Sequence, residues 1–355
     1  MKEVLKAVFW ASAGLIVYAQ AGYPALLAAL GARRAAAPAP PPVADGGEPQ
    51  VSLIVAAHRE EDVIAAKVAN ALALDWPRER LEVIVACDGS PDATAQRARA
   101  AGADVVLELP RAGKVRTQDA GVDAARGEYL AFSDANAQWE PGALRALVAP
   151  LLADPRVGYV CGQVRFTGDG TNQEGLYWRY EMWVRALESR LASVTSGNGA
   201  IYALRREAYL RVDPVMGHDL SFPFNVVKRG LRAVYEPRAR ASEKMVPSIE
   251  GEFARKRRMM SHAWPIVLRG GLLSPRGYPP LYALMIASHR VLRYAAPFLH
   301  VGALLSSALL IGTSWVYALA FGAQLAVLAA AWLAPRHPRR VLLVARYYVL
   351  TTASV

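Results

Sequence analysis

The chain has 355 residues, of which 54% are hydrophobic, and it carries a formal net charge of +11. This apolar content is high for a purely soluble enzyme and predicts membrane segments, while the length allows one large domain with added elements or two domains. Two cysteines give no disulfide framework, which excludes a small disulfide-stapled domain and fits a reducing compartment. The basic residues gather beside apolar segments, so we expect an anionic membrane surface or a phosphorylated substrate and no nucleic acid.

The first apolar segment, residues 8–30, contains no charged residue. At about 1.5 Å per residue it would extend roughly 35 Å, enough to cross a bilayer. A cleaved signal peptide is the alternative, because small residues follow at 35–37, but the segment exceeds the usual apolar core of about 7–15 residues. Arg33 and Arg34 come next, so the positive-inside rule predicts that the following domain is cytoplasmic. We therefore expect an anchor over residues 1–34, followed by a Pro-, Ala- and Gly-rich linker over 35–50.

Beyond the linker, strands alternate with helices. Short apolar runs rich in β-branched residues predict buried strands, and the stretches between them have helical length. This alternation predicts an α/β domain over residues 51–250, with a mostly parallel sheet covered by helices on both faces. The predicted strands are 51–56, 81–86, 104–107, 129–132, 157–166, 201–204 and 233–236. One predicted helix follows the first strand and ends near residue 74, and the others cover 92–101, 115–125, 141–152, 173–191 and 217–228.

Two of these strands each deliver an acidic residue at the carboxyl end. Asp88 follows the second strand, Asp134 follows the fourth, and Gly113-Lys114 lies between them in the sequence. In an open α/β sheet, ligands bind at that edge. Because a hard cation prefers carboxylate oxygens and a lysine neutralises phosphate charge, the pattern favours a metal–diphosphate ligand.

The C-terminal third returns to apolar sequence. Residues 251–280 contain a basic amphipathic stretch that is typical of a helix lying in the bilayer interface. Residues 281–355 then hold apolar spans at 294–312 and 315–334, and a shorter run at 341–355 that is too short to cross a bilayer or is incomplete. Arg336, Arg339 and Arg340 favour a cytoplasmic end, so we expect a multi-pass protein of the inner or plasma membrane.

Four motifs in this order resemble the family 2 glycosyltransferases, which are inverting, nucleotide-sugar-dependent enzymes of the GT-A fold. The likeness extends to bacterial membrane-integrated members similar to cellulose and hyaluronan synthases, and it covers residues 51 to about 264. The motifs are Ala57-His58-Arg59-Glu60-Glu61, Asp88-Gly89-Ser90, Asp134-Ala135-Asn136 and His218-Asp219.

The resemblance implies a role for each matching residue. Asp219 would be the catalytic base, and Asp134 with Asn136 would hold Mg²⁺ or Mn²⁺, although an amide at 136 supplies less charge than the family's second aspartate. The acceptor would meet Gly197, Asn198 and His218. The donor would be bound by Ala57, His58, Glu60, Asp88, Gly89, Lys114, Asp134 and Arg258.

Simpler interpretations of several positions remain open. Asp88 also suits an Asp-Gly turn, and Asp219 also suits a helix N-cap. Arg258 stands where the synthases have the arginine of Gln-x-x-Arg-Trp, but Arg255 and Met259 do not match the Gln and Trp, which weakens the case for a processive polymerase. A basic face on anionic lipid is the alternative role for Arg258.

The sequence thus predicts a membrane-bound enzyme that moves a sugar, most readily from a UDP-sugar, to a polysaccharide or lipid-linked glycan, with glycan-export proteins as further partners. A polyprenyl-phosphate or lipid glycosyltransferase is one alternative. A degenerate, non-catalytic scaffold of a glycan-assembly complex is another, suggested by Asn136, His218 and the altered basic motif.

Overall fold

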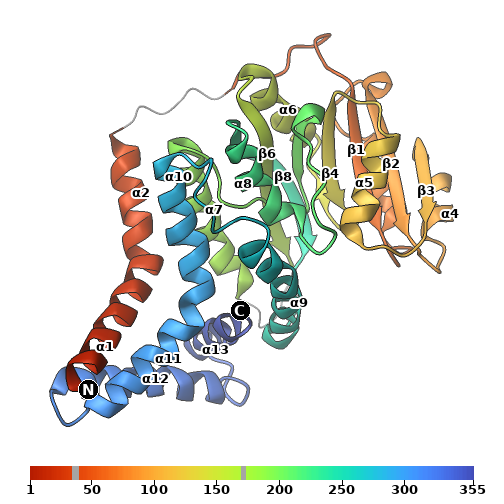
Figure 1. Cartoon of the computed structure of the whole chain (residues 1–355). Coiled ribbons are helices and arrows are strands. Elements are labelled where there is room, and N and C mark those ends of the chain that lie inside the picture. The colour runs from red at the N-terminus through yellow and green to blue at the C-terminus, as the bar shows by residue number, and fades with distance from the viewer. Residues whose placement is uncertain (34–39, 169–172) are drawn as a thin grey trace.

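The computed structural model describes residues 1–33, 40–168 and 173–355 (Figure 1). Arg34 and residues 35–39 of the predicted linker lie outside this part. An eight-stranded sheet forms the centre of the described domain, with strand order β3-β2-β1-β4-β7-β6-β8-β5. Every strand predicted from the sequence is present, and a short strand, β5 (Gln138–Trp139), is added.

The first four strands run parallel and place the predicted site. They are β1 (Val51–Ala57), β2 (Leu81–Asp88), β3 (Val105–Leu109) and β4 (Tyr129–Asp134). Strand β1 lies between β2 and β4, with Ala57 opposite Cys87 and Ala56 opposite Asp134. Asp88 and Asp134 therefore end the two strands that flank β1, at the same edge of the sheet.

The second half of the sheet adds two reversed strands, β7 and β5, to the mostly parallel arrangement that the sequence predicts. Strand β7 (Tyr202–Arg205) is antiparallel to both β4 and β6 (Val157–Thr167), whereas β8 (Arg232–Lys244) is parallel to β6 and antiparallel to β5. The sheet is mixed. Apolar periodicity reports which residues are buried, but the connections decide the direction of a strand.

Alternate residues of the strands face two helical layers. Ile54 and Ile84 pack toward the layer that contains α5 (Lys114–Ala124), α7 (Glu174–Leu191) and α8 (His218–Lys228). Leu53 and Val55 face the other side, covered by α3 (Ile64–Leu72), α4 (Thr94–Ala100) and α6 (Ala143–Ala153). Burial on both faces explains why these strands read as continuous apolar runs.

The long helices lie to one side of the sheet (Figure 1). The N-terminal rod consists of α1 (Lys2–Val17), a π-helical turn at Tyr18–Gly22 and α2 (Tyr23–Ala32). It packs along α11 (Leu292–Leu310), which follows α10 (Pro280–Met285) and a second π-helical turn, Ile286–Val291. A Cβ on Gly302 would lie 2.9 Å from the Ser12 hydroxyl, so the two helices approach closely.

Two described helices are long and apolar enough to cross a membrane by length and composition, which is weak evidence for a membrane protein. They are the rod over Lys2–Ala32 and α12 (Trp315–Leu333), and few of their side chains are buried. The predicted span at 294–312 is helical as α11, but it includes His300 and Pro297 and is less apolar. The described helices therefore do not support the multi-pass expectation.

The amphipathic stretch forms α9 (Ile249–Leu268), whose first turn is capped by the Ser248 hydroxyl. Helix α13 (Arg340–Ala353) packs against it. The Lys256 ammonium donates to the Tyr347 hydroxyl at 3.1 Å, and Trp264 Nε1 donates to the Val355 carbonyl at 2.8 Å. The last apolar run is thus a short helix that covers one side of α9.

Candidate active site

Asp88 organises the loop that precedes α5. Its buried carboxylate accepts from the Ala112 and Gly113 N–H groups at 2.7 and 3.0 Å, and from Arg111 Nη1 at 2.6 Å. A Cβ on Gly89 would come within 2.7 Å of the Arg111 main-chain nitrogen, so close packing requires glycine at position 89. In this structure Asp88 fixes the segment that presents Lys114, and its contact with a nucleotide stays a prediction.

The loop after β1 is tied to the loop after β2. The His58 ring bonds the Asp88 carbonyl through Nδ1 at 2.8 Å, and the Glu60 N–H donates to the Thr94 hydroxyl at 2.9 Å. Burial, together with the charge of Asp134, raises the pKa of Glu60. Ala57, His58 and Glu60 therefore border the same strand edge as Asp88 and Asp134, as the motif predicts.

Lys114, Asp134 and Gly199 meet at this edge. The Lys114 ammonium donates to Asp134 Oδ1, and a Cβ on Gly199 would lie 3.1 Å from Lys114 Nζ and 3.4 Å from Asp134 Oδ2. Burial lowers the pKa of Lys114, but the charges of Asp134, Asp219 and Glu243 outweigh it, and the net shift is upward. Three elements distant in sequence thus surround one ammonium group.

The metal predicted for Asp134 and Asn136 has a sparse set of protein ligands. Asn136 is exposed in the turn after β4, and Asp134 already accepts from Lys114. No group of three His, Cys, Asp or Glu side chains suited to a metal ion occurs in the described part of the chain. One carboxylate and one amide oxygen suit a hard cation only if a ligand's own oxygens complete its coordination.

Asp219 lies in the first turn of α8, beside the 195–199 loop. Its main-chain carbonyl accepts from the Gly197 N–H at 2.7 Å. Its neighbour His218 is 4% exposed, bonds the Tyr202 hydroxyl through Nδ1 at 2.8 Å and stacks on Phe222. Burial, reinforced by the Lys114 charge, lowers the pKa of His218 to about 3. The structure therefore places a neutral His218 in the aromatic core.

The predicted acceptor loop is held by its own polar groups. Asn198 is buried, donates to the Gly162 carbonyl at 2.8 Å and accepts from the Ile201 N–H at 2.9 Å. A Cβ on Gly197 would lie 1.8 Å from the Tyr159 hydroxyl, so only glycine fits there. These contacts leave Gly199 as the loop residue that borders Lys114 and Asp134.

Arg258 is exposed on α9, which follows the last strand of the sheet in the sequence. Its side chain makes no hydrogen bond or ion pair within the described residues. Arg255, one turn earlier, donates from Nη2 to Glu252 Oε1 at 2.6 Å. The predicted contact of Arg258 with a diphosphate stays a prediction.

Two charged residues near Asp134 escaped the sequence analysis. Lys67 on α3 is 0% exposed and donates to the Ala137 carbonyl at 2.7 Å; burial lowers its pKa to about 7. Glu243 lies near the end of β8, where burial and the Asp134 charge raise its pKa to about 7. The signal for Lys67 was a lone lysine on the apolar face of a helix. No sequence signal pointed to Glu243, because the apolar run predicts a strand only over 233–236, whereas β8 continues to Lys244.

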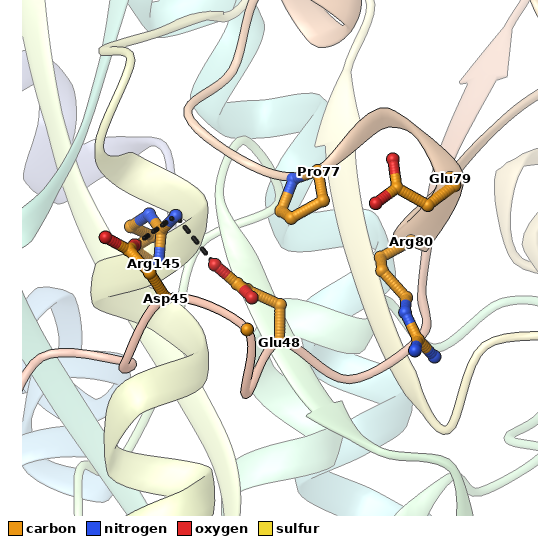
Figure 2. A pocket seen from close by; sticks show the side chains of 7 residues that line it. Asp45, Glu48, Pro77, Glu79, Arg80 and Arg145 are labelled. Atoms are coloured by element: carbon orange, nitrogen blue, oxygen red, sulfur yellow. Dashed lines mark hydrogen bonds and ion pairs between the residues drawn. The ribbon is translucent and has the colours of Figure 1, made fainter.

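A cavity of about 420 Å³ lies at the opposite edge of the sheet, near the start of β2 (Figure 2). Arg145 crosses it to pair with Glu48 at 2.8 Å and Asp45 at 3.2 Å. Buried Val43 and Glu48 show that part of the predicted linker packs on the domain. We do not assign the active site here, because the motif residues end the strands at the other edge. The cavity is lined by Asp45, Gly46, Glu48, Pro77, Glu79, Arg80 and Arg145.

Several known proteins resemble parts of this chain. The glycosyl transferase family 2 model matches residues 52–212. The probable glycosyltransferase YdaM of Bacillus subtilis is 31% identical over 125 residues, 33% of this chain and 30% of that protein. The poly-beta-1,6-N-acetyl-D-glucosamine synthase of Staphylococcus aureus is 22% identical over 249 residues, 66% of this chain and 60% of that protein. The chain thus spans less than two thirds of the length of either relative.

A solved structure resembles nearly the whole chain. It is the mannosyltransferase PcManGT from Pyrobaculum calidifontis, in complex with GDP-Man and Mn²⁺, with a TM-score of 0.74 and 23% identity over 99% of this chain and 97% of that one. At this identity the likeness concerns the fold. Residues 52–212 match the family 2 glycosyl transferase model, and the fold of the chain is that of the solved mannosyltransferase.

Proposed function

We propose that this chain is a membrane-anchored, inverting glycosyltransferase that moves a sugar from a nucleoside diphosphate to a lipid-linked or polysaccharide acceptor. The observation that carries the proposal is the meeting of Lys114, Asp134 and Gly199 at the carboxyl edge of the sheet, with Asp219 near enough to raise the pKa of Lys114. A cation, a carboxylate and a bare backbone suit a diphosphate and an approaching sugar.

The donor would bind across this edge. Its base would lie against the loops after β1 and β2, where Ala57, His58, Glu60 and the Asp88-Gly89 turn are tied together. Its diphosphate would draw the Lys114 ammonium from Asp134, since phosphate oxygens compete for the same donor. Asp134 and Asn136 would hold Mg²⁺ or Mn²⁺, which when bound offsets charge on the departing nucleoside diphosphate.

Transfer would proceed in one displacement. The Asp219 carboxylate takes the proton of an acceptor hydroxyl, and the acceptor oxygen forms a bond to the anomeric carbon. The bond from that carbon to the diphosphate oxygen breaks, and the nucleoside diphosphate leaves with the electron pair beside Lys114. Attack opposite the leaving group inverts the anomeric centre.

The donor could carry either of two nucleotide bases, uracil or guanine. Family likeness favours a UDP-sugar, whereas the mannosyltransferase of similar fold was solved with GDP-Man. We therefore propose a nucleoside-diphosphate hexose as the donor class, with UDP-N-acetylglucosamine and GDP-mannose as the first two compounds to test.

The membrane part of the proposal rests on the apolar helices. The rod over Lys2–Ala32 and α12 carry many exposed apolar side chains, including Trp10, Val17, Leu319 and Trp332. Arg336, Arg339 and Arg340 follow α12, which favours a cytoplasmic catalytic domain. Arg255 and Met259 depart from the Gln-x-x-Arg-Trp pattern of the processive synthases, so we favour transfer of one or a few sugars, with a polyprenyl phosphate or simple lipid as the alternative acceptor.

The test uses the full chain in detergent with native lipids. Each donor is supplied with Mg²⁺ or Mn²⁺, and products are followed by release of nucleoside diphosphate and by the anomeric configuration in the NMR spectrum. Asp219→Asn should lower kcat at least about 100-fold and leave donor binding intact, because only the proton acceptor is lost. Asp123→Asn, exposed on α5, is the matched control.

A different result would change the assignment. If neither donor binds nor turns over in the wild-type protein, the non-catalytic scaffold takes the lead. Turnover that Asp219→Asn leaves unchanged would remove Asp219 as the base.

A further inference from the structure

Arg185 is a buried cation without a carboxylate partner. It lies on α7 and is 2% exposed, and its Nη2 donates to the Gly197 carbonyl at 3.0 Å. Its Nε and Nη1 have no hydrogen-bond partner among the described residues. A buried, incompletely paired guanidinium costs stability, so its presence calls for a compensating role.

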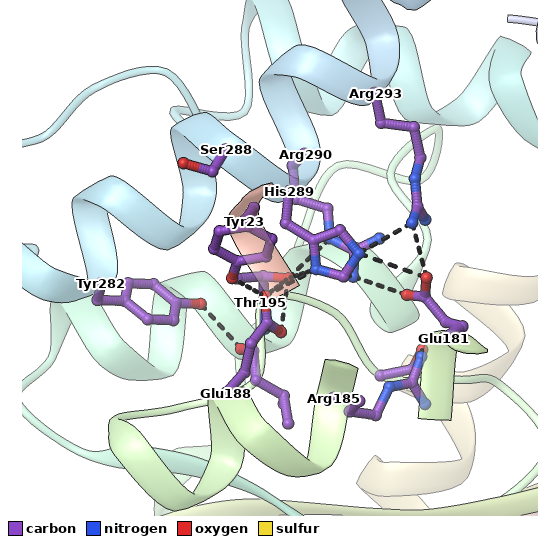
Figure 3. A network of polar contacts seen from close by, with 12 residues as sticks. Tyr23, Glu181, Arg185, Glu188, Thr195, Tyr282, Ser288, His289, Arg290 and Arg293 are labelled. Carbon is purple, nitrogen blue, oxygen red and sulfur yellow. Dashed lines mark hydrogen bonds and ion pairs between the residues drawn. The ribbon is translucent and has the colours of Figure 1, made fainter. Parts of the chain in front are cut away.

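The carboxylates that would naturally pair with Arg185 are engaged elsewhere. Glu181 and Glu188 lie one turn before and after it on α7, within helical reach. Glu181 pairs with Arg290 at 3.0 Å and Arg293 at 2.7 Å, while Glu188 accepts from the Tyr23 hydroxyl at 2.6 Å and bonds His289 at 2.7 Å (Figure 3). These contacts join α7 to the rod and to the π-helical turn and α11, and Arg185 is left to the loop and to the Trp178 ring, 5.6 Å from its guanidinium carbon.

Gly197 is held on three sides. Its carbonyl accepts from Arg185, its N–H donates to the main-chain carbonyl of Asp219 at 2.7 Å, and its α-carbon lies against the Tyr159 hydroxyl. The residue therefore links α7 to the first turn of α8. Movement of the loop away from α7 would release the carbonyl of the residue proposed as the base.

We propose that Arg185 is a positioning residue for Asp219, acting through Gly197 and the 195–199 loop. The inference rests on the proposed function for its catalytic consequence, but the positioning itself can be measured without any substrate. Through its hydrogen bond to the Gly197 carbonyl, Arg185 holds the loop against α7. This contact keeps Asp219 and Gly199 in position beside Lys114 and Asp134.

The kinetic test compares Arg185→Met, Arg185→Lys and Arg179→Met. Methionine keeps much of the length and removes the donors, lysine keeps the charge, and Arg179 is an exposed arginine of the same helix. A base displaced by about 1 Å costs roughly 100-fold in rate, so Arg185→Met should lower kcat by about that factor. The donor KM should change less than about twofold, Arg185→Lys should recover about tenfold, and Arg179→Met should match the wild type.

The second readout is amide hydrogen exchange in the ligand-free chain. Arg185→Met should speed exchange at residues 195–199 and 218–220 at least about tenfold and leave the rest of α7 protected. If the methionine variant does not fold, Arg185→Lys is the test: it keeps the charge but loses the guanidinium geometry, so exchange at 195–199 should still be faster than in the wild type, by a smaller factor.

Three outcomes would overturn the proposal: unchanged exchange at 195–199, faster exchange with unchanged kcat, or a kcat in Arg185→Lys no higher than in Arg185→Met. If the wild type transfers no sugar, the proposed function fails separately. Hydrogen exchange then still decides whether Arg185 holds the loop.

Discussion

The Lys114 ammonium donates a hydrogen bond to Asp134 Oδ1, joining the first residue of α5 to the last residue of β4. The carboxylate that would meet a metal ion is therefore partly neutralised before any ligand arrives. A diphosphate that attracts Lys114 would free Asp134 for a cation, so donor and metal are expected to strengthen each other's binding.

Asn136→Asp should tighten metal binding. A second carboxylate beside Asp134 adds charge to a site that has only one carboxylate and one amide oxygen, and hard cations respond to ligand charge. We expect the metal concentration at half-maximal activity to fall about tenfold, measured by titrating Mn²⁺ at saturating donor. Gln138→Glu, two residues on at a half-buried position, is a charge-matched comparison. An unchanged metal requirement would separate residue 136 from the metal.

Gly199→Ala should lower activity with little change in stability. The new methyl group would lie 3.1 Å from Lys114 Nζ, so the flexible lysine must shift from Asp134. We expect kcat/KM to fall roughly tenfold and the unfolding free energy to change by less than about 1 kcal/mol. Gly142→Ala is the control, because nothing lies within 4 Å of its added carbon. Full activity of Gly199→Ala would show that the loop does not border the reacting groups.

His218 should make the protein acid-sensitive. Burial lowers its pKa to about 3 from 6.5, so between these values the unfolded chain binds a proton that the native state excludes. Stability therefore falls as the pH drops through that window, by up to about 1.4 kcal/mol per pH unit. Thermal unfolding midpoints at pH 7.5 and 5 should differ more for the wild type than for His218→Gln. Parallel pH profiles would contradict the assignment.

Glu181→Gln should destabilise the junction between the catalytic domain and the long helices. The change leaves the buried Arg290 and the half-buried Arg293 without their carboxylate, and breaking a buried pair costs about 3–5 kcal/mol. We expect a lower unfolding midpoint and earlier aggregation in detergent. Glu207→Gln, exposed at a surface turn, should match the wild type. An unaltered midpoint for Glu181→Gln would mean that the network contributes little to stability.

The sequence alone determined the alternation of strands and helices, and with it the edge where Asp88 and Asp134 meet. The strands could be predicted because strands buried on both faces of a sheet have continuous apolar sequences, and their ends could be predicted because polar turns follow them. Family resemblance added a role for each motif, which stays a prediction, and the enzyme class, which the family match over residues 52–212 supports.

Only the tertiary structure decided which charges share the site. Lys67, Arg185 and Glu243 come from α3, α7 and β8, and no spacing in the sequence links them to Asp134 or Gly197. The burial of His218 among aromatic rings and the antiparallel entry of β7 were equally hidden. Local patterns fix which residues are buried and where elements end, whereas contacts between distant elements depend on how the chain crosses the sheet.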